Sequence, residues 1–248
     1  MRLLPIALLC CLPASEAMAS PIELTTSVRT VHSAPLNCIA IGTTLATCDK
    51  SAILIDDLTG SQTSRIVATA EAGFGRVSAF GSETNFPRFQ SAHAEARAEF
   101  TDVVTLFAPT SGSVRAVFEV TAAGFASAGQ GSFQGCLETC VSYFIGGFSG
   151  RTEHLFLRTP LLSFSSGDSF ELSGAAFVDS VLMQDGSSRI STFGILRGFE
   201  LFGEDGSPLS TYGVQSAAGA EYATVVPEPT TILMLGTGCV ALLRRRRR

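Results

Sequence analysis

The strongest constraint on the fold is a strict alternation of apolar and polar residues in the middle of the chain. Within Ala92–Thr101, alanine and phenylalanine alternate with histidine, glutamate, arginine and threonine. Alanine and glutamate favour helix by propensity, but a period of two places every apolar side chain on one face of a strand. After a turn that contains Pro109 and Gly112, Val114–Thr121 repeats the pattern. We therefore expect two strands, each with one apolar face.

Further segments have strand character and are separated by turn residues. These strands are expected at Arg65–Ala70, Val141–Ile145, His154–Arg158, Ser169–Asp179, Ile190–Phe193 and Gly198–Phe202. Glycine-containing turns lie at Gly146-Gly147, Ser166-Gly167-Asp168, Asp185-Gly186 and Glu204-Asp205-Gly206. The sequence predicts an all-β body over residues 20–225, an antiparallel β-sandwich with a jelly-roll-like topology. Within it, Ala217–Val225 is expected to be a last strand or a linker.

The N-terminal segment, residues 1–19, has the parts of a secretory signal peptide. A positively charged start precedes the apolar stretch Leu3–Leu12. Ala17 and Ala19 are small residues at positions −3 and −1 of a cut before Ser20. The alternative, a buried or membrane-anchoring helix, is disfavoured because the apolar stretch is short. We expect the protein to be exported.

The C-terminal segment combines an apolar stretch with a basic end. Thr230–Leu243 is shorter than the ~20 residues that cross a bilayer comfortably, and counting from Val225 lengthens it. The basic residues that follow are Arg244, Arg245, Arg246, Arg247 and Arg248. Five guanidinium groups do not cross the membrane, so they act as a stop-transfer signal and keep this end cytoplasmic. We expect a single C-terminal transmembrane helix.

A proline-rich motif precedes this apolar stretch. The motif residues are Val226, Pro227, Glu228 and Pro229. The order of motif, apolar segment and arginine cluster over residues 226–248 resembles the PEP-CTERM sorting signal of exported proteins in Gram-negative bacteria. The resemblance implies processing near the motif by exosortase, a membrane-embedded cysteine protease or transpeptidase, and therefore only transient anchoring in the inner membrane. Cys239 within the apolar segment departs from the commonest pattern.

Four of the seven cysteines lie in the expected body. They are Cys38, Cys48, Cys136 and Cys140. In an oxidising compartment an even number favours disulfides, with three possible connectivities; the sequence-local pairing is the simplest. The alternative is a four-thiolate zinc site, but only the spacing of Cys136 and Cys140 suits one. We expect disulfides and no metal.

Charge and motifs argue against several functions. The chain carries a net charge of −5, and five of its 17 basic residues are the terminal arginines; the body is therefore acidic, and we expect no nucleic-acid partner. No H-E-x-x-H, G-x-S-x-G, P-loop or EF-hand motif is present. His93 is expected on a solvated face with Glu95. We expect neither an enzyme nor a cofactor.

Two functions remain for the body. The first is a non-enzymatic protein of the cell envelope, outer surface or extracellular matrix; the resemblance implies association with exopolysaccharide in a biofilm. The alternative is a secreted carbohydrate- or Ca²⁺-binding β-sandwich module. The acidic pairs Asp56-Asp57 and Glu204-Asp205 supply too few oxygens for Ca²⁺ on their own. The chain has no Trp and three Tyr to form a sugar platform, and its 18 Phe are expected in the core.

Overall fold

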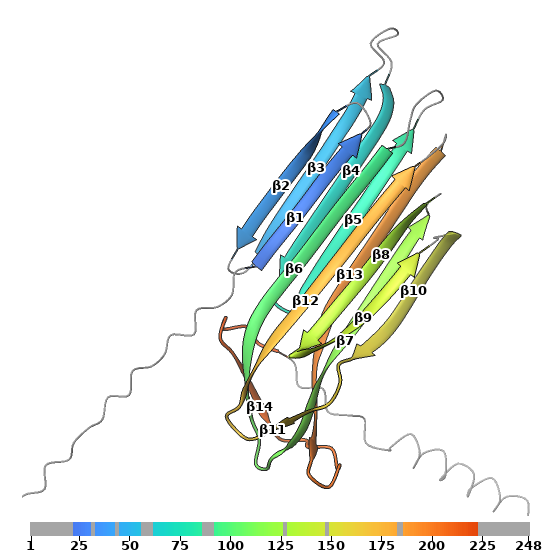
Figure 1. Cartoon of the computed structure of the whole chain (residues 1–248). Helices are drawn as coiled ribbons and strands as arrows, with labels where there is room; N and C mark the ends of the chain where they lie inside the picture. Colours follow the sequence, from blue (N-terminus) through green and yellow to red (C-terminus); the bar gives the residue numbers. More distant parts are fainter. Residues whose placement is uncertain are drawn as a thin grey trace, which may run out of the picture.

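Two antiparallel β-sheets lie face to face in the computed structural model (Figure 1). The structure describes residues 22–30, 33–42, 45–55, 62–85, 92–125, 128–146, 149–182 and 186–222. Within these ranges every regular element is a strand, and no helix there is long and apolar enough to cross a membrane. The expected all-β sandwich is confirmed.

The first sheet has the strand order β2-β1-β6-β12-β8-β9, and β14 also pairs with β6. Its strands are β1 (Ile22–Thr30), β2 (Ser33–Gly42), β6 (Ala92–Phe107), β8 (Ala128–Leu137), β9 (Thr139–Gly146), β12 (Ser169–Leu182) and β14 (Gly213–Ser216). β1 and β14 pair with different halves of the long strand β6. Residues 100–103 of β6 thus lie between the stretch that pairs with β1 and the stretch that pairs with β14.

The second sheet has the order β10-β7-β13-β5-β4-β3, and β11 also pairs with β7. Its strands are β3 (Leu45–Ile55), β4 (Gln62–Gly73), β5 (Arg76–Asn85), β7 (Gly112–Phe125), β10 (Ser149–Arg158), β11 (Leu162–Phe164) and β13 (Gly186–Gly203). From β5 to β8 each successive strand lies in the opposite sheet. The short strands β11 and β14, with the loops beside them, lie at one end of the sandwich (Figure 1).

The two alternating segments of the sequence form the strands β6 and β7, which lie in opposite sheets. In β6 the side chains of Ala94, Ala96, Ala98 and Phe100 are buried, as the period of two predicts. The separate strands expected at Ile190–Phe193 and Gly198–Phe202 are one strand, β13, with a bulge between Leu196 and Gly198. A bulge changes the phase of the alternation, which explains why the sequence pattern looks interrupted there.

Phenylalanine rings of one sheet pack onto glycines of the other. A Cβ on Gly135 of β8 would lie 2.5 Å from the ring of Phe118 in β7, and one on Gly194 of β13 would lie 2.0 Å from the ring of Phe133 in β8. Close packing of the core therefore requires glycine at these two positions as well as the large phenylalanine rings.

The expectation that phenylalanines are core residues is only partly correct. Phe100, Phe118, Phe133 and Phe199 are fully buried, whereas others are exposed on the outer faces and at strand ends. The exposed ones are Phe107, Phe125, Phe144, Phe156 and Phe193. Aromatic residues suit strands on either face, so composition alone does not separate the two groups.

Candidate functional site

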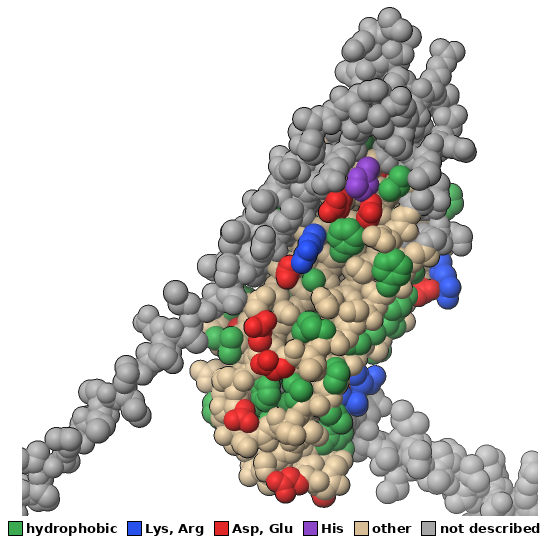
Figure 2. Space-filling model, in the orientation of Figure 1, with side chains coloured by type: hydrophobic (Ala, Val, Ile, Leu, Met, Phe, Trp, Pro, Cys, Tyr) green, Lys and Arg blue, Asp and Glu red, His purple; other side chains and the backbone are tan. Residues whose placement is uncertain are grey.

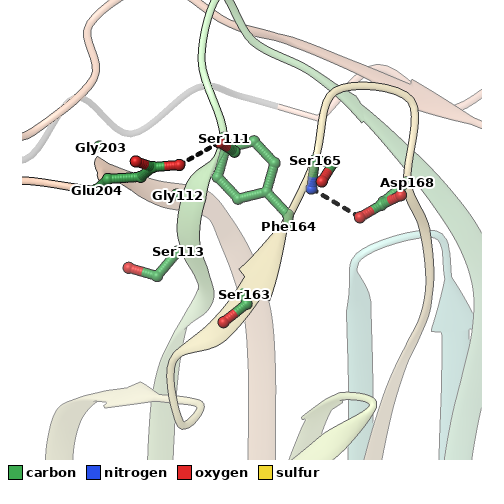
Figure 3. Close-up of a pocket in the computed structure, with 9 residues that line it drawn as sticks. All are labelled: Ser111, Gly112, Ser113, Ser163, Phe164, Ser165, Asp168, Gly203 and Glu204. Atoms are coloured by element: carbon green, nitrogen blue, oxygen red, sulfur yellow. Dashed lines mark hydrogen bonds between the residues drawn. The ribbon is translucent and has the colours of Figure 1, made fainter.

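A pocket of about 580 Å³ opens at the end of the sandwich that carries β11 and β14 (Figure 3). It lies where β11, the start of β7 and the end of β13 meet. Four serines, two carboxylates, one phenylalanine and two glycines line it: Ser111, Ser113, Ser163, Ser165, Asp168, Glu204, Phe164, Gly112 and Gly203. Hydroxyl and carboxylate groups thus dominate its wall.

Each carboxylate is held by a short hydrogen bond. The backbone N–H of Ser165 donates to Oδ2 of Asp168 at 2.7 Å, which closes the tight turn at Gly167. The hydroxyl of Ser111 donates to Oε1 of Glu204 at 2.6 Å. In Figure 3 the carboxylates of Asp168 and Glu204 lie on opposite sides of the pocket, and a dashed line marks the hydrogen bond that each accepts. Both acidic side chains are therefore oriented before any ligand arrives.

The wall of the pocket requires glycine at position 112, the first residue of β7. Gly112 is paired with Gly203, and a Cβ on Gly112 would lie 1.9 Å from the carbonyl oxygen of Phe202. Next to it, Ser113 and Ser163 are direct partners of the β7–β11 pair. Directly paired residues project to the same face of a sheet. Their two hydroxyls therefore form a neighbouring pair of donors and acceptors that suits a polyhydroxylated ligand.

The acidic pairs do not assemble a cation site in the described part of the chain. Asp205 accepts hydrogen bonds from the hydroxyl and backbone N–H of Ser207, at 2.5 and 2.9 Å, which hold its pKa below the usual range. Its neighbour Glu204 turns to Ser111 instead. Among the residues the structure describes, no group of three metal-ligating side chains lies together. Asp56-Asp57 falls outside those residues.

The two described histidines form surface pairs. Nε2 of His93 lies 2.5 Å from Oδ1 of Asp179, and not on the expected partner, Glu95. Asp179 is the direct cross-strand partner of Glu95 and lies diagonally across from His93, whose own direct partner is Val181. Nε2 of His154 lies 2.5 Å from Oε1 of Glu119. Hydrogen bonding by His154, followed by the hydrogen bond and charge of Arg197, lowers the pKa of the Glu119 carboxyl.

Sequence reasoning missed two carboxyl groups that are completely buried. The side chains of Glu83 in β5 and Asp102 in β6 are both 0% exposed. The alternation that buries Ala98 and Phe100 places Asp102 on the same inward face when it is extended past Thr101. The signal for a buried acid was therefore present in the pattern, one residue beyond the segment we assigned.

One expected disulfide is confirmed. Cys136 and Cys140 are bonded, with their Cα atoms 4.0 Å apart, and they join β8 to β9 around the turn at Glu138. Cys48 is also disulfide-bonded. The backbone of Cys38 lies in β2 and its side chain is outside the described part of the structure; the pairing of Cys38 with Cys48 stays a prediction.

The terminal sites lie outside the described residues, which end at Tyr222. They are the expected cleavage residues Ala17, Ala19 and Ser20, the motif Val226, Pro227, Glu228 and Pro229, and the cluster Arg244–Arg248.

Comparison with protein families identifies the C-terminal segment. Residues 225–248 match the family model of the PEP-CTERM protein-sorting motif, which confirms the resemblance seen in the sequence. The match implies export, membrane-associated sorting and processing by exosortase. No curated protein matches the chain.

Proposed function

We propose that this chain, which carries the PEP-CTERM sorting motif, is a non-enzymatic protein of the cell envelope, outer surface or extracellular matrix. The position of the motif carries the proposal. It begins at residue 225, three positions after Tyr222, where the described body ends. The entire sandwich therefore precedes the processing signal, and it is the part that is delivered.

The proposed export route uses both ends of the chain. Residues 1–19 act as the signal peptide, with cleavage between Ala19 and Ser20. Thr230–Leu243 then holds the chain in the inner membrane as a helix, with Arg244–Arg248 on the cytoplasmic side. Exosortase acts near the Pro-Glu-Pro sequence and ends this anchoring.

Features of the body support a role outside the cytoplasm. The disulfide between Cys136 and Cys140 suits an oxidising compartment. Acidic side chains are spread along an outer face of the sandwich (Figure 2), and three of them, Glu95, Glu99 and Asp179, project from neighbouring strands. The order β5-β13-β7-β10 opposite β6-β12-β8-β9 supports the jelly-roll interpretation, because the chain winds repeatedly from sheet to sheet. We place this body in a biofilm matrix, in contact with exopolysaccharide.

The pocket favours a second candidate, a carbohydrate-binding module. The hydroxyls of Ser113 and Ser163 and the oriented carboxylates of Asp168 and Glu204 match the donors and acceptors of a sugar. Ca²⁺ is the weaker ligand for this pocket, because it takes six to eight oxygen ligands.

The first experiment tests sorting. The full chain is produced in an exosortase-containing Gram-negative host and in a matched strain that lacks the enzyme, and the mature protein is measured by intact mass. We expect Ser20 at the N-terminus in both strains, and a C-terminus near Val226–Pro229 only in the strain that contains exosortase. Replacing Pro227, Glu228 and Pro229 by alanine is expected to leave Arg248 in place. Loss of the arginines without exosortase would contradict the proposal.

The second experiment tests the pocket. Thermal unfolding of the body is followed with neutral oligosaccharides and, separately, with Ca²⁺; a ligand at about 100 Kd stabilises the folded state by ~2.7 kcal/mol. Glu204→Gln is expected to abolish a sugar-dependent shift, and Asp205→Asn in the same turn is the control. A shift that is equal in both variants would place the ligand elsewhere.

A further inference from the structure

The segment that leads into the sorting motif is held by the body. We call residues 217–222 the docked segment. It follows β14 and starts at the stretch of β6 between the pairings with β1 and β14: the N–H of Ala217 donates to the carbonyl of Val103 at 2.8 Å. The N–H groups of Ala218 and Ala220 both donate to the hydroxyl of Ser216, at 3.1 Å. The docked segment is therefore fixed without being a strand.

The buried carboxylate of Asp102 is the centre of this contact. Its Oδ2 accepts hydrogen bonds from the hydroxyls of Ser216, at 2.5 Å, and Tyr222, at 2.6 Å. Its Oδ1 accepts from the N–H of Ala218 at 3.2 Å and from that of its neighbour Val103 at 2.7 Å. Three of these four donors thus come from residues 216–222. Hydrogen bonds to a buried charged group are among the stronger ones in a protein.

Tyr222 closes the docked segment. Its ring packs edge-on against Phe199, with centroids 6.2 Å apart, and lies close enough to Gly75 that a Cβ there would be 3.2 Å from it. Burial and the adjacent Asp102 raise the pKa of the Tyr222 phenol, so it remains a hydrogen-bond donor.

Docking leaves little chain between the body and the sorting motif. From Tyr222 to Val226 the chain spans at most about 14 Å, and to Thr230, where the apolar segment begins, at most about 28 Å. A membrane-embedded enzyme that acts near Pro227–Pro229 must work within this gap. Release of the docked segment adds six residues, or about 20 Å of reach.

We infer that Asp102 and Tyr222 restrain the sorting reaction by holding residues 217–222 on the body. Exosortase acts on the state in which these residues have left the body. The inference rests on the sorting function. Local opening of this kind precedes the main unfolding of a protein, and cleavage that follows rapid opening tracks the population of the open state. Asp102 and Tyr222 therefore limit the rate of processing without contacting the enzyme.

The first test is the rate of processing of Tyr222→Phe in the exosortase-containing host. The variant keeps the ring and removes one hydrogen bond to the carboxylate, which is expected to raise the open population and the rate about tenfold. The matched control is Tyr212→Phe: the Tyr212 hydroxyl donates to the carbonyl of Phe199 on the same body but lies outside the docked segment. We expect the control to be processed at the rate of the unchanged protein.

The second test bypasses Asp102. Six Gly and Ser residues inserted between Ala223 and Thr224 lengthen the free chain while the docked segment stays in place. This insertion is expected to accelerate processing at least as much as Tyr222→Phe does, because it removes the need for opening, and adding Tyr222→Phe to the insertion is expected to give no further acceleration.

The results separate the possible failures. Unchanged or slower processing of either Tyr222→Phe or the insertion overturns the inference. Equal acceleration by Tyr212→Phe also overturns it, because general loss of stability would then be the cause. If the unchanged protein is not processed at all, it is the sorting function that fails.

Discussion

At the scale of single residues, the core holds Glu83 as a neutral acid. The side chain of Glu83 in β5 is fully buried. The hydroxyl of Ser180, in β12 of the other sheet, donates to Oε2 of Glu83 at 3.4 Å. Its Oε1 has no hydrogen-bond partner within the described structure. Burial raises the pKa of Glu83 from 4.5 to about 9, against the smaller opposing effects of hydrogen bonds from Ala94 and Ser180.

This pKa makes stability fall with pH. Because the folded state keeps a proton that the unfolded state loses, the stabilising effect is complete below about pH 4.5 and is lost between 4.5 and 9, by ~1.4 kcal/mol per pH unit. Glu83→Gln keeps the shape without the titration. We expect it to raise the unfolding free energy by about 3 kcal/mol at pH 7 relative to the unchanged protein, with little difference at pH 4.

Urea unfolding at pH 4, 7 and 9 measures this difference. A constant offset between the two proteins at all three values would show that Glu83 is ionised in the folded state as well.

At the scale of elements, the β8–β9 hairpin is closed by the disulfide between Cys136 and Cys140. The cross-link encloses a loop of five residues, and in the chain-entropy model a loop of this size stabilises by roughly 2 kcal/mol. The double variant Cys136→Ala/Cys140→Ala is expected to lose about that amount in chemical denaturation and to keep its strand content. A loss as large as the total stability would mean that the cross-link stabilises much more of the sandwich than this hairpin.

The same hairpin shows what the sequence pattern can and cannot predict. Val141–Ile145 was expected as a strand and lies within β9, but its partner β8 was not expected. β8 contains Gly129, Gly131 and Gly135, and glycine is unfavourable in strands by propensity. The reason for Gly135 is the ring of Phe118 in the opposite sheet. Such a reason exists only in the folded molecule, and the pocket, which joins three separate strands and three loops, was unpredictable on the same grounds.

At the scale of the whole molecule, alternation and turn residues predicted the all-β sandwich because they depend only on neighbours along the chain. The end of the body was predicted less well. Ala217–Val225 was expected to be a last strand or a linker, whereas the last strand, β14, ends at Ser216 and residues 217–222 are docked on β6. The cause is Asp102, more than 100 positions earlier in the chain, and no local pattern connects the two.

This contact makes the last residues of the body part of its core. A chain shortened to residues 20–222 is expected to melt like the full body. A chain shortened to residues 20–212 lacks β14 and three of the four donors to Asp102, and a buried charge without partners costs about 3–5 kcal/mol. That is a large part of the 5–15 kcal/mol that stabilises a typical domain, so we expect the shorter chain to melt far lower or to lose its cooperative transition.

The substitution Asp102→Leu shows whether the shorter chain is destabilised by the carboxylate of Asp102, which has lost its partners, or by the loss of β14. In the chain of residues 20–222 this substitution removes a fully hydrogen-bonded acid and is expected to lower the melting temperature. In the chain of residues 20–212 it removes a buried acid that has lost its partners, and is expected to raise the melting temperature, because leucine needs no donors. The opposite signs, measured by circular dichroism, would show that the requirement for residues 213–222 arises from Asp102. The same sign in both chains would attribute that requirement to the packing of β14 alone.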